Sequence, residues 1–167
     1  MNRFKRMGLS AYACAAVILL ALVAWPPAAG AKGLGCVAVT ESDIANLFAQ
    51  WNDAVKTGNP DTVVNLYAAD AILLPTVENG PLIGHAAIRG YFVHFLADRP
   101  SGKIDERTIR TGCNVALDAG LYTFTYATPK ETTVKPKDPT PARFTYVYEY
   151  EGGRWLITHH HSSKRPR

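Results

Sequence analysis

The stretch from Arg143 to Ser163 reads RFTYVYEYEGGRWLITHHHSS. Tyr, Thr, Val and Ile are frequent on both sides of Gly152-Gly153, and these residue types favour pleated, half-buried strands. Two glycines between two such runs supply the tight turn of an antiparallel hairpin. The stretch therefore predicts strands over 143–151 and 154–162 that pair with each other.

The region before this hairpin also has the composition of β-strands. Residues 103–111, 114–117 and 121–128 are rich in Thr, Tyr, Val and Ile, and Asp118-Ala119-Gly120 has the composition of a tight turn. Residues 129–141 hold four prolines and three lysines, and because proline cannot donate to a sheet ladder we expect an exposed loop there. The second half of the chain thus predicts an antiparallel sheet of about four to six strands.

Helical periodicity dominates the part of the chain that precedes these strands. We expect Thr40 to cap a helix over 41–56, and we expect a second short helix over 61–69 and a third over 86–98. A short strand over 72–74 separates the last two helices. Three helices followed by an antiparallel sheet predict an α+β domain, in which helices cover one face of a curved sheet and the resulting cone encloses a pocket.

The N-terminus has the three parts of a secretory signal peptide. Basic residues precede an apolar run over 11–23, and Ala29-Gly30-Ala31 fits an A-x-A cleavage site. We therefore expect a signal peptide over 1–31, a single domain over 32–163 and a basic tail over 164–167. The mature protein would be secreted or periplasmic, without a stable membrane anchor. An uncleaved membrane anchor is the alternative.

Cleavage would change both the charge and the cysteine content. Three basic residues would be lost, which lowers the net charge from +4 to +1, so we expect no nucleic-acid partner. Cys14 would be lost as well, leaving Cys36 and Cys113, which we expect to form a disulfide. In the chain-entropy model such a bridge stabilises the fold by about 3 to 5 kcal/mol. The alternatives are two separate buried thiols, or a lipoprotein attached through Cys36.

Three adjacent histidines form the densest polar cluster in the chain. Because side chains alternate along a strand, we expect His159 and His161 to share a face with Trp155 and Ile157. The alternative is a single bulge, which would exchange His160 for its neighbours. Two imidazoles do not complete a zinc site, and the chain has no HExxH or CxxC spacing, so we expect no metal. Two roles stay open: the histidines satisfy one another and the backbone, or they line the pocket, where His161 would donate to a carboxylate or carbonyl.

We expect side chains from several helices and strands to line the pocket. Its expected lining consists of Trp51, Tyr67, Tyr91, Arg143, His159 and His161. The alternatives are a position of Arg143 at the rim and a purely core role for the aromatic residues. The chain has no nucleophile, P-loop or dinucleotide motif, so we expect no cofactor. For an enzyme, the candidate general bases are Asp70 and His161, with His85 and Asp118 as further candidates.

The stretch over 143–163, with its Tyr-rich strand, Gly-Gly turn and histidine run, resembles the C-terminal hairpin of the association (hub) domain of calcium/calmodulin-dependent protein kinase II. It resembles still more the secreted bacterial relatives of that domain within the NTF2-like and SnoaL-like superfamily. Further matching pieces lie over 47–52, over 66–76 and at Tyr91-Phe92. The resemblance implies a cone-shaped α+β barrel that assembles through its sheet into dimers or larger rings, without kinase activity.

The resemblance also implies a pocket that holds small carboxylates through arginines and a histidine. Here Ser162 and Ile88 stand where the hub has an arginine and a histidine. We therefore expect a secreted or periplasmic NTF2-like protein that self-associates and can hold a small ligand in its cone. The alternatives are an enzyme like the superfamily's polyketide cyclases or ketosteroid isomerases, with a general base in the same pocket, and a purely structural oligomer with a dry pocket.

Overall fold

The computed structural model of the protein describes residues 35–76, 78–127 and 137–166. The signal peptide expected over 1–31 and much of the loop expected over 129–141 lie outside the described residues. The elements, in chain order, are α1 (Glu41–Lys56), α2 (Pro60–Val64), β1 (Tyr67–Leu74), β2 (Leu82–Ile83), α3 (Gly84–Phe95), the 3-10 turn η1 (Leu96–Asp98), β3 (Pro100–Thr111), β4 (Val115–Tyr126), β5 (Thr140–Glu151) and β6 (Arg154–Lys164).

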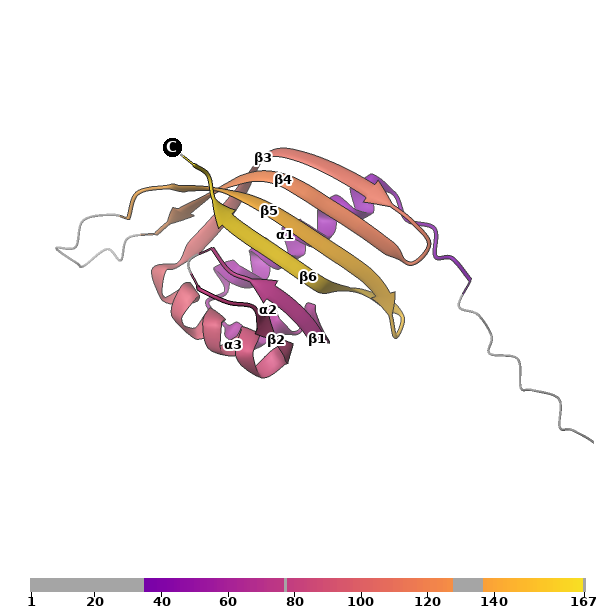
Figure 1. Ribbon diagram of the computed structural model, residues 1–167, viewed down its shortest axis with the longest axis horizontal. Helices are drawn as coiled ribbons and strands as arrows, with labels where there is room; N and C mark the ends of the chain where they lie inside the picture. The colour runs from indigo at the N-terminus through magenta and orange to yellow at the C-terminus, as the bar shows by residue number, and fades with distance from the viewer. Residues whose placement is uncertain (1–34, 77, 128–136, 167) are drawn as a thin grey trace, which may run out of the picture. The chain divides into compact units, whose positions relative to one another are not determined.

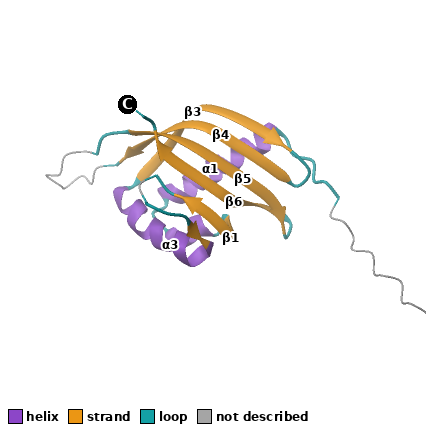
Figure 2. Ribbon diagram, viewed as in Figure 1, coloured by secondary structure: helices purple, strands orange, loops and turns teal. Residues whose placement is uncertain are grey.

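The strands form one curved sheet in the order β2-β1-β6-β5-β4-β3 (Figure 1). β1 runs parallel to β6, and the other described pairs are antiparallel. The helices lie against one face of this sheet (Figure 2). The ring of Trp51 in α1 lies 5.7 Å from that of Tyr146 in β5, and Phe95 in α3 lies 5.4 Å from Phe124 in β4. The α+β class is confirmed, and the expectation of a purely antiparallel sheet is corrected by the parallel β1–β6 pair.

The first helix forms where its capping residues and its apolar period predict it. The Thr40 hydroxyl accepts a hydrogen bond from the backbone N–H of Asp43 at 3.1 Å, and the Asp43 carboxylate accepts one from the backbone N–H of Thr40 at 2.9 Å. This reciprocal arrangement satisfies donors that a helix N-terminus otherwise leaves free. The same helix buries Phe48 and Trp51, so its sequence places two large aromatic side chains over the sheet.

The second expected helix, over 61–69, is too long. α2 ends at Val64, and the chain is already extended at Tyr67, which pairs with Ile157 of β6. The Leu66 carbonyl accepts a hydrogen bond from the Ile157 backbone N–H at 2.9 Å. Apolar residues at 63, 66 and 67 fit either a short helix or the start of a strand, and pairing with β6 decides between the two.

The turn expected at Asp118-Ala119-Gly120 is absent, because β4 runs unbroken through these residues. Gly120 lies opposite Arg107, beside an irregularity in β3 that brings the two backbones close together. A Cβ atom at this position would lie 2.0 Å from the carbonyl oxygen of Glu106. The glycine therefore permits a close backbone approach in the middle of a strand, a role that its sequence context did not distinguish from a turn.

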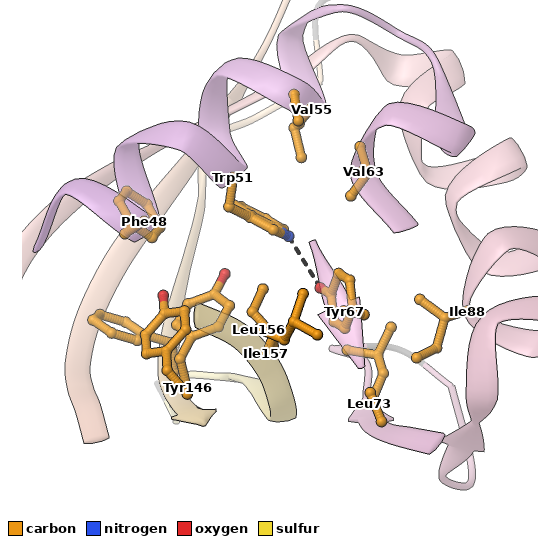
Figure 3. Close-up of a cluster of buried hydrophobic side chains, with 14 of the residues drawn as sticks. Phe48, Trp51, Val55, Val63, Tyr67, Leu73, Ile88, Tyr146, Leu156 and Ile157 are labelled. Atoms are coloured by element: carbon orange, nitrogen blue, oxygen red, sulfur yellow. Dashed lines mark hydrogen bonds between the residues drawn. The ribbon is translucent and has the colours of Figure 1, made fainter. Parts of the chain in front are cut away.

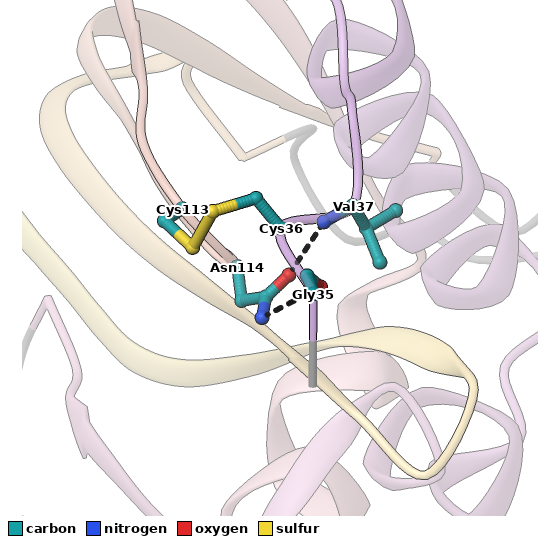
Figure 4. The surroundings of a disulfide bond; sticks show 5 residues. All are labelled: Gly35, Cys36, Val37, Cys113 and Asn114. Atoms are coloured by element: carbon teal, nitrogen blue, oxygen red, sulfur yellow. Dashed lines mark hydrogen bonds between the residues drawn. A yellow bond between two sulfur atoms is a disulfide. The ribbon is translucent and has the colours of Figure 1, made fainter. Parts of the chain in front are cut away.

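The predicted disulfide is confirmed. Cys36 and Cys113 are joined, and they lie 77 positions apart in the sequence (Figure 4). Cys113 sits in the loop between β3 and β4, and beside it the Asn114 side chain accepts a hydrogen bond from the Val37 backbone N–H at 2.8 Å. The bridge and this hydrogen bond together hold the segment before α1 against the end of the sheet.

Candidate functional site

The inner face of the sheet carries a row of buried polar side chains. Asp118 of β4 is in register with Tyr146 of β5, and Tyr146 with His160 of β6. Asp118 and Tyr146 are fully buried, and His160 is only 3% exposed. The ring of Trp51 crosses above His160 at 5.5 Å. Buried polar groups in proteins are normally hydrogen-bonded, so each unpaired one in this row needs an explanation.

An extra residue in β6 decides which histidine faces inward. Tyr148 pairs with Ile157 and the neighbouring Val147 pairs with His159, so Thr158 has no opposite residue on β5. Such a bulge reverses the alternation of side chains beyond it. Ile157 and His160 are consequently both buried, whereas His159 is half-buried and His161 is exposed. The expectation that His159 and His161 share the inner face with Ile157 is corrected.

Two hydrogen bonds connect the His160 ring to Trp51 through the Tyr67 hydroxyl. The indole N–H of Trp51 donates to the Tyr67 hydroxyl oxygen at 3.0 Å (Figure 3). That hydroxyl also lies 2.9 Å from Nδ1 of His160. An indole nitrogen can only donate, so the single proton of Tyr67 is the one available for His160. In the tautomer that carries its hydrogen on Nε2, Nδ1 accepts the Tyr67 proton, and the hydrogens of Trp51 and Tyr67 are then both used.

Nε2 of His160 is buried and has no hydrogen-bond partner among the described residues. His160 lines a cavity of about 10 Å³, close to the space of one water molecule. The remaining lining consists of Trp51, Leu73, Pro75, Thr76, Tyr91, Phe92, Phe95, Tyr122, Phe124 and Ser162. The Tyr122 hydroxyl donates to the Ser162 hydroxyl at 2.6 Å, and Ser162 also contacts Thr76. The cavity lining is thus mostly aromatic and includes hydroxyl groups and one imidazole.

Burial holds His160 in its neutral form. Desolvation, followed by the charges of the neighbouring His159 and His161, lowers the pKa of His160 to about 3. The imidazole is accordingly a neutral donor through Nε2 near neutral pH, not a cation. A base of such low pKa takes up a proton poorly, so the geometry favours hydrogen bonding over proton transfer at this position.

A second buried polar group lies farther along the same face. Asp118 accepts hydrogen bonds from Nε of Arg107 at 3.2 Å and from a terminal nitrogen of Arg107 at 2.5 Å. Burial raises the pKa of Asp118, and the hydrogen bonds and charge of Arg107 oppose that rise. The guanidinium also lies over the Phe48 ring, 5.6 Å from its centre. Asp118 is therefore engaged in a paired structural contact.

The other expected site residues divide between the two faces of the sheet. Trp51 and Tyr91 line the cavity, and Tyr67 supports His160 from behind. Arg143 and His161 line a shallow groove of about 560 Å³ on the outer face instead, and Arg143 donates to the Lys164 carbonyl at 3.1 Å. The structure does not bring Arg143, His159 and His161 together with the aromatic residues.

The candidate general bases also lie apart from the cavity. Asp70 and His161 are exposed. His85 contacts the Tyr67 backbone carbonyl at 2.9 Å, and Asp118 is paired with Arg107. Across residues 35–76, 78–127 and 137–166, no three His, Cys, Asp or Glu side chains are grouped to hold a metal ion.

The sequence did not indicate Ser162 and Thr76 as lining residues, and it indicated His160 only for the case of a bulge. Residues of strand type lie on both sides of Thr158, and nothing in that composition marks it as the extra residue. Among the helices of the described residues, none combines the length and the apolar character that crossing a membrane requires.

Comparison with known proteins agrees with the fold. The family model for the calcium/calmodulin dependent protein kinase II association domain matches residues 40–166. A Xanthomonas campestris structure described as such an association domain is 42% identical, covers 80% of this chain and 96% of its own, and superposes with a TM-score of 0.70. No curated protein matches.

More distant structures share the fold alone. An NTF2-like protein of unknown function from Pseudomonas putida KT2440 is 20% identical, with a TM-score of 0.63 over 77% of this chain and 89% of its own. A Streptomyces avermitilis protein of the NTF2-like family, described as a dehydratase, is 13% identical, with a TM-score of 0.66 over 75% and 97%. Since the family model covers most of the chain, the protein belongs to the calcium/calmodulin dependent protein kinase II association domain family, with an NTF2-like fold.

Proposed function

We propose that this protein is an extracytoplasmic self-association domain that assembles through the outer face of its sheet. The observation that carries the proposal is that α1 and α3 both pack on the inner face, so among the described residues no helix covers the outer face (Figure 2). The family model names an association domain, which agrees with this arrangement.

The outer face has the composition of a contact surface. Alternation along β4 and β5 directs onto it the half-buried side chains Leu117, Ala119, Leu121, Thr145 and Val147. Ile72 of β1, next to His159 in the sheet, adds an exposed apolar side chain that is 39% accessible. A sheet face with this many uncharged side chains is stabilised when a second layer covers it. A second copy of the chain supplies that layer through a two-fold contact.

The disulfide supports a location outside the cytoplasm. Bridges between distant parts of a chain persist in oxidising compartments and are rare in the cytosol. The signal peptide expected over 1–31 would direct the chain to such a compartment. Mass spectrometry of the non-reduced protein purified from the periplasm or medium tests this part: two free thiols at Cys36 and Cys113 would contradict it.

The assembly is tested by replacing one residue at the centre of the outer face. We expect the wild-type protein to sediment as a dimer or larger species, and Leu121→Arg to sediment as a folded monomer. A two-fold contact would bring in two introduced arginines, each beside Arg143, which pairs with residue 121 across the sheet, and like charges in contact are costly. The matched control is Gln50→Arg, at an exposed position of α1, which should keep the wild-type mass. A monomeric wild type, or an assembly unchanged by Leu121→Arg, would overturn the proposal.

A further inference from the structure

We infer that His159 and His161 form half of a divalent-metal site, which a second copy of the chain completes with the same two residues. The inference rests on the proposed self-association and assigns a ligand to the same outer face. Zn²⁺ is the expected occupant, because imidazole suits this cation and four ligands complete a closed tetrahedral site. One chain alone supplies only two of the four imidazoles.

The bulge at Thr158 places both imidazoles on the outer face. His159 is half-buried and His161 is exposed, and the buried His160 lies between them on β6. Side chains two residues apart on a strand point to the same side, with about 7 Å between their Cα atoms. Among the described residues neither outer imidazole makes a hydrogen bond, whereas the rings of His160 and His85 do. Both outer rings are therefore available as ligands.

The two histidines lie in the middle of the outer face. Their strand, β6, has β1 on one side and β5 on the other, and β2 and β4 lie beyond these. The four residues opposite them on the two neighbouring strands are uncharged: Ile72, Leu74, Thr145 and Val147. A second copy that covers the outer face therefore covers both histidines.

The charges on β5 select how two copies stack. Arg143 and Glu149 are both exposed on the outer face of this strand. Tyr146 lies midway between them in the sequence and is in register with His160. When the β5 strands of two copies run antiparallel across the contact, Arg143 of each copy lies opposite Glu149 of the other. A parallel stack would instead place like charges opposite each other, which is costly.

The antiparallel stack brings four imidazoles together. A two-fold axis at the level of His160 exchanges the levels of His159 and His161, so each of these histidines faces the other one of the second copy. Leu121 then faces Val115 of the second copy, which adds an apolar contact on β4. The arrangement that pairs the charges is thus the one that gathers the histidines.

The spacing of two packed sheets suits a metal ion between them. Such sheets lie about 10 Å apart, and each residue advances a strand by about 3.4 Å. Each histidine Cα is then about 5 Å from the midplane and about 3.4 Å from the two-fold axis, hence about 6 Å from an ion on that axis. A histidine side chain with a Zn–N bond of about 2 Å spans this distance. All four imidazoles can therefore reach one ion.

Carboxylates accompany the histidines on this face. The hydroxyl of Thr158, next to His159, donates to Oε1 of Glu149 at 3.2 Å and so holds an acidic group beside the site. Arg143 lines the same groove as His161. In the antiparallel stack Glu149 of the second copy offsets the charge of Arg143, so the cation does not meet an unpaired arginine.

Zinc titration of the metal-free protein tests the inference. We expect calorimetry to give one zinc ion for two chains. Because an ion held by both copies links metal binding to assembly, sedimentation equilibrium should show a dimer at least about tenfold tighter with zinc than with EDTA.

Three single variants of one kind identify the ligands. His161→Gln and His159→Gln each remove two of the four imidazoles, so each should abolish the zinc response while keeping the dimer seen in EDTA. His94→Gln, at an exposed position of α3, is the matched control and should respond to zinc as the wild type does. Thermal unfolding establishes that each variant is folded.

Charge reversal tests the antiparallel stack. Arg143→Glu and Glu149→Arg each place like charges opposite each other, so each variant should weaken the zinc-linked dimer. The variant that combines both substitutions pairs opposite charges again and should restore it.

Three results would overturn the inference. They are zinc that binds to single chains or does not bind at all, zinc-linked assembly that survives His161→Gln, and a combined charge reversal that leaves the dimer as weak as the single reversals do. The proposed self-association fails separately: a wild type that is monomeric with and without zinc contradicts it, whereas a dimer in EDTA that zinc does not tighten contradicts only the metal site.

Discussion

Acidification should destabilise this protein through His160. The unfolded chain exposes an ordinary histidine with a pKa of 6.5, whereas burial holds the pKa of His160 in the fold at about 3. Between these two values the unfolded state binds a proton that the folded state does not. Stability therefore rises with pH through this window and is lost as the pH falls below about 6.5.

The magnitude follows from the distance between the working pH and the unfolded pKa. A pH of about 4.5 is two units below the ordinary histidine pKa of 6.5. At this pH the unfolded imidazole is protonated, whereas the folded one remains neutral. With about 1.36 kcal/mol for each unit, the free energy of unfolding falls by about 2.7 kcal/mol relative to about pH 8. This is a large part of the net stability of an ordinary domain.

Urea unfolding followed by tryptophan fluorescence measures the effect. Wild type and His160→Phe are compared at about pH 8 and about pH 4.5, at one protein concentration because assembly also contributes to stability. The titrations of His159 and Asp118 are common to both proteins, so their contributions cancel in the difference between the two pH profiles. His161→Phe should keep most of the acid sensitivity of the wild type, because burial, not the charge of His161, is the largest cause of the low pKa of His160. Parallel profiles for wild type and His160→Phe would refute the assignment of acid sensitivity to this buried imidazole.

Three further predictions concern the fold. Gly120→Ala should lower the free energy of unfolding by at least about 3 kcal/mol, because the added Cβ meets a backbone oxygen at 2.0 Å; an unchanged thermal midpoint would contradict the continuous strand. Asn52→Ala should lower the free energy of unfolding in urea by about 2 to 4 kcal/mol. The Asn52 side chain accepts a hydrogen bond from the N–H of buried Gly102 at 2.8 Å and donates one to its carbonyl at 2.9 Å. Asn52→Asp should keep only the hydrogen bond from that N–H. Replacing Cys36 and Cys113 with serine should remove about 4 kcal/mol, because the bridge closes a separation of 77 residues, and adding a reductant to the double variant should have no further effect.

The main elements could be predicted from the chain because their signals are local. The capping box at Thr40 and the apolar period after it define α1, and the Gly152-Gly153 turn defines the β5–β6 hairpin. The disulfide was predictable by counting cysteines once a signal peptide was recognised. The order of these elements was sufficient to predict an α+β fold.

The errors arise where a contact distant in sequence decides the local structure. Asp118 and Gly120 have the composition of a turn, but Asp118 pairs with Arg107 and Gly120 admits the backbone of β3. Residues 66–69 fit a helical period, but their backbone is extended because β1 pairs with β6. In each case the strand partner supplies the information, and a single sequence does not reveal where that partner lies.

The extra residue at Thr158 matters most for function. With strict alternation after Ile157, His159 and His161 would face the core and His160 would face outward. The bulge reverses this order and places one histidine in an aromatic interior that holds it neutral, while the other two lie on the outer face. The inner face thus receives one buried imidazole, and the outer face receives the half-buried His159 and the exposed His161. One added residue therefore separates the chemistry of the cavity from the chemistry of the proposed association surface, although both are built on the same strand.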